Sequence, residues 1–451
     1  MAGHPVAISA TFGACGSHQR LCRRCMASDR QTHFASVSFR RKALACSPEG
    51  CLPVSVTAPR QFVLPEKPKA PPSVRVVPAR PIRALMSNPC ETVGVGRTCR
   101  SILAASIAAG YRADLVTARF DGEVPPGLVV RDGRPRFVRH LPFGRRIADG
   151  LLHRRYLETV GEGDIAYLWP SVPVSVYERL ARRGVTIVTE SVNTRMAVAK
   201  PLLDAAYDAL GLPPAHGITD LRIAIQNLRQ ILCSAIFAPS PAAEHAFAGT
   251  PVASRVIPTS YGTWVPATLP DRPVRVPGAP VTFVFVGSVC VRKGAHLLLE
   301  AWRRPPPGAR LRLLGAVEPA IRSCFADVLD GETVSAVGFS NDVAQELLRA
   351  DVAVLPSLEE GDPISTYEAA AHGLPVLASA AGAGRIGAET GALEIVDPSD
   401  IAAFRDRLAA YAADEDLRRA RGAVARVAAL GYDWSRVGPD RFDKLFAFLG
   451  R

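Results

Sequence analysis

The sequence lacks long uninterrupted apolar runs, although 48% of its 451 residues are hydrophobic. A membrane-spanning helix needs about 20 consecutive apolar residues, so none is expected. The first residues also lack the charged start, apolar run and cleavage site of a secretory signal. Cysteine is sparse, and the 10 scattered residues do not suggest a disulfide framework. We therefore expect a cytoplasmic protein, either free or at the inner face of the membrane.

Most of the chain also has little net charge. The total is +12, but residues 1–80 hold 12 Lys/Arg against 3 Asp/Glu, which is +9 and leaves only +3 for the remainder. The basicity is therefore local and non-specific, and we expect no nucleic-acid partner. The same region is rich in Ser, Pro and Cys and has no periodic apolar pattern. It predicts a disordered or poorly ordered basic tail and linker over residues 1–75.

The tail contains one group of residues that could bind a metal. Cys22 and Cys25 are flanked by His18 and His33, and two Cys with two His can hold zinc. One CxxC without a second pair at zinc-site spacing is a weak pattern, and free thiols are the favoured interpretation. We predict no metal site.

From residue 76, apolar strand patterns alternate with helical patterns, and the alternation restarts near residue 281. This order indicates parallel sheets covered by helices. Residues 260–280 are dense in Pro and Gly and separate the two runs. We predict an α/β fold with two doubly wound, Rossmann-like domains that face a cleft: an N-terminal domain over 76–262 and a C-terminal domain over 263–451. The predicted strands are 82–87, 112–118, 164–169, 185–191, 231–240, 281–288, 309–316, 333–339, 351–357 and 375–379; the predicted helices are 97–110, 173–184, 294–304, 341–350, 365–371, 399–414 and 415–430.

Two glutamates, Glu360 and Glu368, stand eight residues apart in "EEGDPISTYEAAAHGLPVLAS". They follow the strand at 351–357, and ligands of such sheets bind beyond the carboxyl ends of the strands. A local role is also open. Ser365 and Glu368 have the spacing of a capping box with Ser365 as N-cap, and Glu360 alone could be an exposed loop acid.

Four segments carry a resemblance to a known family. They are "VIPTSYGTWV", "VFVGSVCVRKGAHLLLEAW", "LRLLGAV" and the stretch from "VSAVGFSNDVAQELLRADVAVLPSLEEG" to "VLAS". In this order they resemble the group 1 (family 4) glycosyltransferases, which are retaining, nucleotide-sugar-dependent enzymes of the GT-B fold, many of them in polysaccharide biosynthesis. The resemblance is specific over 281–379, is fainter over 82–260 and does not extend to 1–75. It implies transfer of a hexose to a glycan, lipid-linked or small-molecule acceptor, with neither metal nor cofactor.

The resemblance assigns roles to the two glutamates and to a basic pair. Glu360 would accept hydrogen bonds from the hydroxyls of the donor sugar, and Glu368 would grip the ribose diol. Lys293 and Arg292 would meet the negative charge that develops on the leaving phosphate. We therefore predict Glu360, Lys293 and Arg292 as catalytic residues.

Further donor contacts are implied by the same resemblance. A glycine-rich turn would let backbone approach the donor, the segment 338–340 would lie near the base, and the helix start near Ser365 would offer backbone N–H groups to phosphate. The predicted additional donor-binding residues are Gly94, Gly96, Ser288, Gly338, Phe339, Ser365 and Thr366.

Three positions depart from the family pattern. Ser288 stands where the family usually has Arg, so Arg292 would supply that charge. Asp362 replaces a residue of a Gly-Phe-Gly run, and a carboxylate is unfavourable beside a diphosphate unless it points away. Glu190 replaces a frequent histidine and would contact the sugar or the acceptor.

Two other functions compete with a transferase. A catalytically silent GT-B module could bind a sugar nucleotide or a protein partner without turnover. An NAD-dependent oxidoreductase is disfavoured, because Cys99 occupies the third glycine position after Gly94 and Gly96, and no acidic residue ends the second strand.

Overall fold

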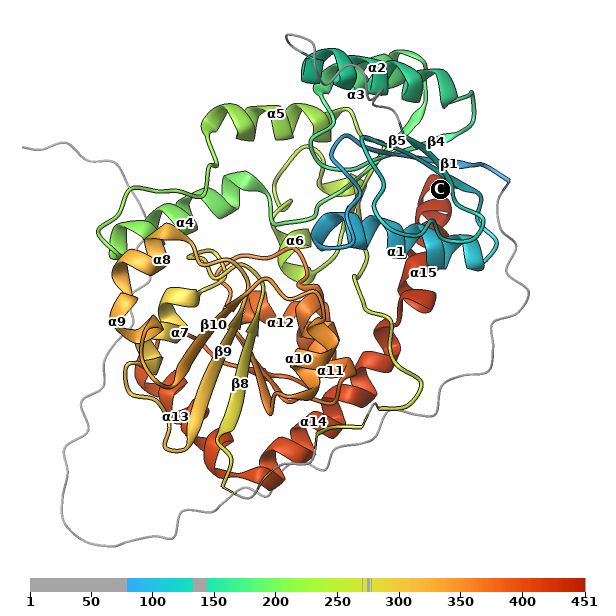
Figure 1. Ribbon diagram of the computed structural model, residues 1–451. Coiled ribbons are helices and arrows are strands. Elements are labelled where there is room, and N and C mark those ends of the chain that lie inside the picture. Colours follow the sequence, from blue (N-terminus) through green and yellow to red (C-terminus); the bar gives the residue numbers. More distant parts are fainter. Residues whose placement is uncertain (1–78, 133–143, 270, 274–275, 277, 451) are drawn as a thin grey trace, which may run out of the picture. The chain divides into compact units, whose positions relative to one another are not determined.

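The computed structural model describes residues 79–132, 144–269, 271–273, 276 and 278–450 (Figure 1). The predicted tail over residues 1–75 and its candidate zinc residues lie outside these ranges. No helix within the described ranges combines the length and hydropathy of a membrane span.

The first lobe is built on a seven-stranded parallel sheet with the strand order β3-β2-β1-β4-β5-β6-β7. Its central strands are almost wholly buried, as expected when helices cover both faces of a parallel sheet. The order reverses between β1 and β4, which places a topological switch point beside the loop before α1. The elements are β1 (Ile82–Met86), α1 (Gly94–Ala108), β2 (Ala113–Thr117), β3 (Val129–Asp132), α2 (Gly144–Thr159), β4 (Ile165–Leu168), α3 (Val174–Arg182), β5 (Thr186–Glu190), α4 (Met196–Ala209), α5 (Asp220–Ile231), β6 (Ala235–Ala238), α6 (Pro241–His245) and β7 (Val256–Pro258).

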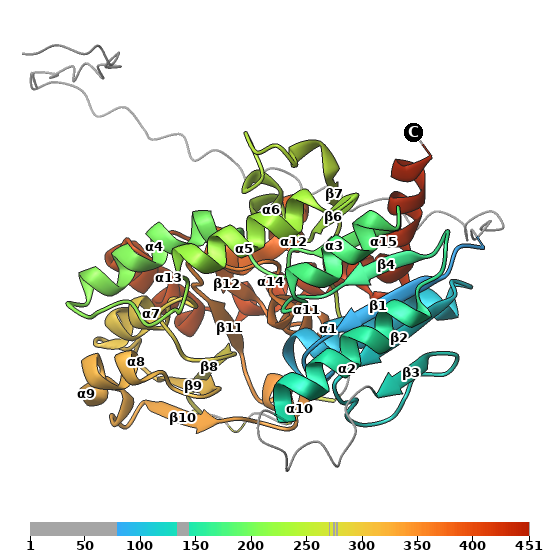
Figure 2. The ribbon, with the colours of Figure 1, turned by 90° about the horizontal axis from the view of Figure 1, so that it is seen from above.

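The second lobe contains a six-stranded parallel sheet with the order β10-β9-β8-β11-β12-β13 (Figure 2). The apolar run "VTFVFV" forms its central strand β8, which pairs with β9 and β11. The elements are β8 (Val281–Val286), α7 (Ala295–Trp302), β9 (Ala309–Leu314), α8 (Pro319–Cys324), α9 (Ala326–Leu329), β10 (Val334–Gly338), α10 (Val343–Leu348), β11 (Val352–Leu355), α11 (Ile364–Ala371), β12 (Val376–Ala378), α12 (Ala380–Thr390), β13 (Glu394–Ile395), α13 (Ile401–Ala413), α14 (Glu415–Ala429) and α15 (Trp434–Leu449).

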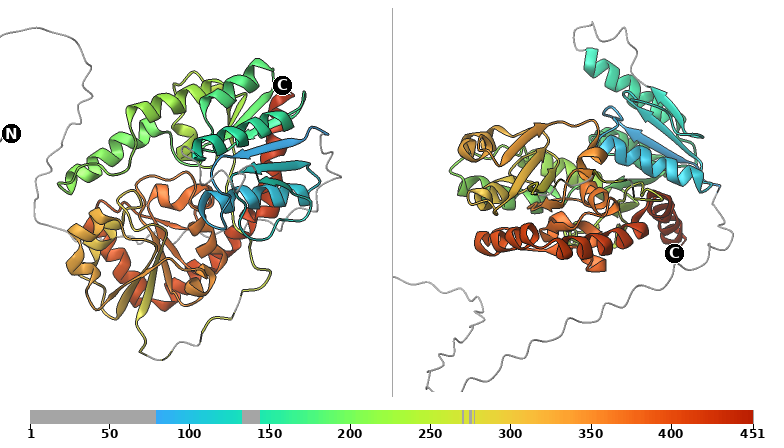
Figure 3. Two further views of the ribbon diagram at one scale, coloured as in Figure 1. Left: turned by 45° about the horizontal axis from the view of Figure 1, so that its top comes forward. Right: turned by 60° about the horizontal axis from the view of Figure 1, so that its bottom comes forward.

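The last helix, α15, packs on the first lobe rather than the second. It lies beside α1 (Figure 3), and Gly438 permits this approach, because a Cβ there would lie 2.8 Å from that of Ala105. Tyr111 also stacks on Phe446 of α15 with ring centroids 6.0 Å apart. We predicted one domain over 263–451. The two sheets divide between Pro258 and Val281, and the bounds of the two domains stay a prediction.

The predicted α/β class with two doubly wound sheets is confirmed. Most predicted strands and helices form within a few residues of the expected bounds. The sequence patterns did not predict the short edge strands β3, β7 and β13 or the helices α2, α4, α5, α6, α8, α9, α12 and α15.

Candidate functional site

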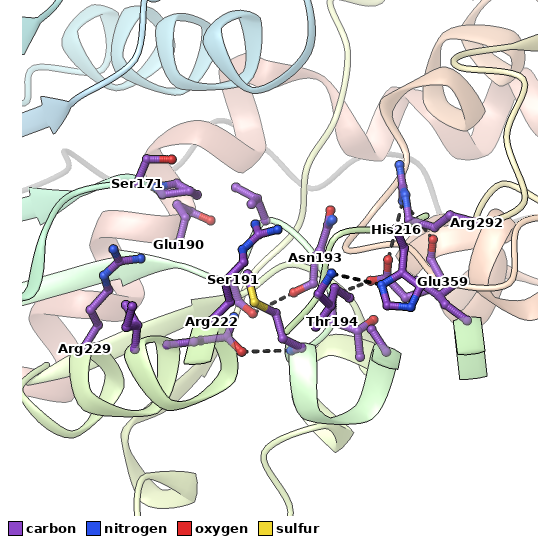
Figure 4. Close-up of a pocket in the computed structure, with 18 of the residues that line it drawn as sticks. Ser171, Glu190, Ser191, Asn193, Thr194, His216, Arg222, Arg229, Arg292 and Glu359 are labelled. Atoms are coloured by element: carbon purple, nitrogen blue, oxygen red, sulfur yellow. Dashed lines mark hydrogen bonds and ion pairs between the residues drawn. The ribbon is translucent and has the colours of Figure 1, made fainter. Parts of the chain in front are cut away.

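A cleft of about 640 Å³ lies at the carboxyl ends of β4 and β5 and is walled by α4 and α5 (Figure 4). The second lobe contributes Cys290, Arg292, Glu318 and Glu359 to its lining. Residues of both lobes therefore line one cavity beyond strand ends, where ligands of open parallel sheets bind.

The predicted catalytic residues form one charged cluster at the edge of this cleft. Arg292 lies 3.1 Å from Glu360, and the Lys293 ammonium also pairs with Glu360. The Ser357 hydroxyl donates to the Glu360 carboxylate at 3.1 Å. Glu360 follows β11, whereas Arg292 and Lys293 follow β8, which is the strand paired with β11. Parallel pairing therefore brings the three side chains to the same sheet edge.

The electrostatics of this cluster favour its ionised state. Burial alone would raise the pKa of Glu360, but the charges of Lys293 and Arg292 outweigh it and hold that pKa below the usual value. Burial would likewise lower the pKa of Arg292, yet Glu360 and Glu359 hold it above the usual value. The side chains of Arg292 and Lys293 remain 28% and 13% exposed, and Arg292 lines the cleft.

A short loop of the first lobe contacts the loop that carries Glu360. The Thr194 backbone N–H donates to the Glu359 carboxylate at 2.8 Å, and the Thr194 hydroxyl donates to the Glu360 carbonyl at 3.0 Å. Gly361 makes the approach possible, because a Cβ there would lie 2.0 Å from the Val192 carbonyl oxygen. Burial raises the pKa of Glu359, although Arg292 opposes the shift.

Glu368 lies on α11 and pairs with Arg97 of α1 at 2.5 Å. The capping-box prediction was wrong. Pro363 is the N-cap of α11, the helix begins at Ile364 without a side-chain capping hydrogen bond, and Ser365 lies within its first turn. The Glu368 side chain is therefore not fixed by a capping interaction with Ser365.

The two glycines of the first loop have different structural roles. Gly94 has a φ of 53°, in the left-handed region that favours glycine. Gly96 has no room for a side chain, because a Cβ there would lie 2.3 Å from the backbone nitrogen of Glu91. These glycines shape the turn that places Arg97 opposite Glu368.

The other predicted donor-binding residues differ in accessibility. Ser288 and Phe339 are exposed at the ends of β8 and β10, and Gly338 lies just before Phe339 with a φ of 78°. Ser365 is half-buried, whereas Thr366 is fully buried and donates its hydroxyl to the Gly382 carbonyl at 2.6 Å. The Thr366 hydroxyl is thus engaged within the fold.

Asp362 points away from the basic pair. It accepts hydrogen bonds from the backbone N–H groups of Tyr261 (2.8 Å) and Arg385 (2.9 Å) and from the Tyr367 hydroxyl. Burial is the largest influence on it and raises its pKa to about 6. This orientation answers the concern raised by a carboxylate near a diphosphate.

Glu190 is enclosed, although its position borders the cleft. Its carboxylate lies 2.9 Å from Arg441 of α15 and accepts hydrogen bonds from the hydroxyls of Tyr167 and Tyr261. The side chains of Glu190 and Arg441 are both 0% exposed. Contact of Glu190 with a sugar stays a prediction, and in this conformation its oxygens are bonded within the fold.

Several residues in or near the candidate site were not singled out from the sequence. They are Glu359 and Thr194 at the contact between loops, Arg97 opposite Glu368, and Arg222 and Arg229 on α5. The seven-residue spacing of Arg222 and Arg229, which places both on one helical face, was the available signal.

Comparison with known proteins finds a family match within the second lobe. Residues 280–414 match the family model described as "Glycosyl transferases group 1". WcaL of Escherichia coli (strain K12), named as a colanic acid biosynthesis glycosyltransferase, is 32% identical over 121 residues, which cover 24% of this chain and 30% of WcaL. The D-inositol 3-phosphate glycosyltransferase of Xylanimonas cellulosilytica is 31% identical over 182 residues, which cover 37% of this chain and 43% of that protein. The chain thus aligns with less than half the length of these curated relatives.

A solved structure matches over both lobes. HepE of Anabaena, determined in complex with UDP and glucose, superposes with a TM-score of 0.58 and 16% identity, covering 82% of this chain and 99% of HepE. The resemblance is confirmed: the second lobe has the sequence pattern of group 1 glycosyltransferases, and both lobes together have the GT-B fold.

Proposed function

We propose that this protein is a retaining glycosyltransferase that moves a hexose from a nucleotide diphosphate sugar to a glycan, lipid-linked or small-molecule acceptor. The main support for this proposal is the cluster of Arg292, Lys293 and Glu360 at the cleft edge. The solved HepE structure, which contains UDP and glucose, supports a uridine nucleotide as the first donor to test. From the sequence alone we also propose a place in the cytoplasm, free or at the inner face of the membrane.

The proposed chemistry assigns opposite charges to separate parts of the donor. Lys293 and Arg292 stabilise the diphosphate as the bond between the sugar C1 and the phosphate oxygen breaks. Glu360 accepts hydrogen bonds from the sugar hydroxyls, since a carboxylate has two acceptor oxygens. The acceptor oxygen bonds to C1 on the face that the phosphate leaves, and its proton passes to the departing diphosphate.

The cluster has to rearrange its contacts to bind this donor. Glu360 now pairs with both cations, so the diphosphate would take over Lys293 and Arg292 while Glu360 turns to the sugar. In the same way, the ribose diol would replace Arg97 on Glu368. Arg97 is 37% exposed and Glu368 10% exposed, so the arginine can turn to solvent as the diol replaces it on the buried carboxylate.

The test measures nucleoside diphosphate release from UDP-glucose, UDP-galactose and GDP-mannose, with and without acceptor sugars. We expect release with at least one donor. Glu360→Gln should lower turnover more than UDP affinity, because UDP lacks the transferred sugar. A wild-type protein that binds UDP but releases none from any donor would favour the silent GT-B module instead.

A further inference from the structure

The helix α5 presents two arginines, Arg222 and Arg229, to the cleft. Seven residues are nearly two turns, so both lie on one face about 10 Å apart along the axis. Figure 4 shows their guanidinium groups extending from α5 in the same direction. Ile225 and Gln226, which lie between them, line the same wall.

Among the described residues, Arg229 lacks the carboxylate partner that other arginines with a buried, unpartnered Nε have. Its Nε is buried without a hydrogen-bond partner, and it forms no ion pair with any carboxylate that the structure describes. Burial lowers its pKa, and the charge of Arg222 acts in the same direction. Each of the other described arginines with a buried, unpartnered Nε lies within 4.0 Å of a carboxylate oxygen: Arg131, Arg407, Arg421 and Arg441. Since an unpaired, partly buried cation is unfavourable, an anion in the cleft would stabilise Arg229.

The surroundings of Arg222 and Arg229 leave donors available to a ligand. Arg222 gives one N–H group to the Gly217 carbonyl at 2.6 Å, and within the described ranges it has no carboxylate partner. Ser171 lines the same cleft with a φ of 76°, the one left-handed non-glycine conformation among the described residues. Strained backbone of this kind concentrates at binding sites.

We propose that Arg222 and Arg229 bind an oxyanion, a phosphate or a carboxylate, carried by the acceptor; this rests on the proposed transferase function. Guanidinium forks match both groups, because two parallel N–H donors meet two oxygens. The two arginines project from the first lobe, whereas Arg292 and Lys293, the cations proposed for the donor diphosphate, belong to the second. The acceptor is thereby restricted to acidic molecules.

The test compares glucose 6-phosphate, glucuronate and glucose as calorimetric probes at low ionic strength. Wild-type protein should bind at least one acidic probe about tenfold or more tightly than glucose. Arg229→Met and Arg222→Met should each weaken that binding by about 10- to 100-fold. UDP affinity should not change. Arg182→Met on α3 removes the same charge from a 73% exposed position and should bind every probe like wild type.

The two acidic probes separate the sources of the oxyanion. Preference for glucose 6-phosphate identifies a phosphate, and preference for glucuronate identifies a carboxylate. Arg229→Lys keeps the charge without the fork and should lie between Met and wild type. If Arg229→Met does not fold, the exposed Arg222 supplies the same comparison.

Two results would overturn the proposal. If neither acidic probe bound more tightly than glucose, an oxyanion subsite would be excluded. A loss of UDP affinity equal to the loss of the acidic probe would assign the arginines to the donor. Failure of the proposed function itself is distinct, because it appears in wild-type protein as absent UDP binding or absent donor turnover.

Discussion

Two buried carboxylate–cation clusters in this protein have similar components and different surroundings. Glu190 and Arg441 are both fully enclosed, and burial raises the pKa of Glu190 despite the opposing charge of Arg441. Glu360 is also buried, but its cations Arg292 and Lys293 are partly exposed, Arg292 lines the cleft, and both cations hold the pKa of Glu360 below the usual value. An enclosed pair can only fix structure, whereas a pair open to a cleft can exchange its partner for a ligand.

The largest effect is expected from breaking the enclosed cluster. Arg441→Met should lower the free energy of unfolding by about 3–5 kcal/mol, because it leaves Glu190 buried without its cation. Urea unfolding would measure the loss. Arg436→Met, exposed on the same helix, should stay within about 0.5 kcal/mol of wild type. Equal stability of Arg441→Met and wild type would show that the enclosed pair does not hold α15 on the first lobe.

In the open cluster, substitution should affect binding more than folding. Lys293→Ala should weaken UDP binding by about 1.5–3 kcal/mol relative to its effect on uridine, because only UDP carries the diphosphate. Calorimetry with both ligands measures the difference. Lys444→Ala, which removes a surface charge on α15, serves as the control. Equal losses for UDP and uridine would remove Lys293 from the phosphate site.

Glu368→Gln tests the same distinction at the predicted ribose contact. The amide loses the charge and presents an N–H₂ group where an acceptor is needed, so UDP affinity should fall by about 1–3 kcal/mol. The unliganded protein should melt within a few degrees of wild type, because the amide can still accept a hydrogen bond from Arg97, whose side chain is 37% exposed. A large fall in melting temperature with unchanged UDP affinity would make Glu368 a structural residue.

The residues of the open cluster were predicted from the resemblance to group 1 glycosyltransferases, and local sequence patterns predicted the strands that carry them. The strands before Arg292 and Glu360 are continuous apolar runs, and such runs identify buried parallel strands without tertiary information. The charged residues follow those runs directly. For Glu360 the rule that ligand sites form beyond strand ends supported a site from the sequence, whereas Arg292 and Lys293 entered through the resemblance.

The enclosed cluster could not be predicted in this way. Glu190 and Arg441 lie far apart in sequence, and their pairing depends on α15 returning to the first lobe. Pro439 lies within α15, and Pro201 lies within α4, so proline interrupted the pattern of two helices that tertiary packing nevertheless stabilises. The pairing of Glu190 with Arg441 could not be predicted from the sequence for that reason.

Asp362 offers the smallest and most specific test, because it is a second enclosed carboxylate without a direct cation partner. Its folded pKa of about 6 lies above the usual 3.8, so between these values the folded protein holds a proton that the unfolded chain has lost. The stability from this proton is complete below the unfolded pKa and is lost as pH rises through about 6. One such group contributes a slope of at most about 1.4 kcal/mol per pH unit.

Asp362→Asn cannot titrate and should flatten the fall in unfolding free energy across this window. Its absolute stability should also drop, because its amide N–H₂ faces the donors of Tyr261, Tyr367 and Arg385. Urea unfolding at several pH values gives the slope. Asp416→Asn serves as the control, because the Asp416 side chain is 89% exposed. An unchanged slope in Asp362→Asn would show that Asp362 is ionised throughout the window and that enclosure alone does not raise its pKa.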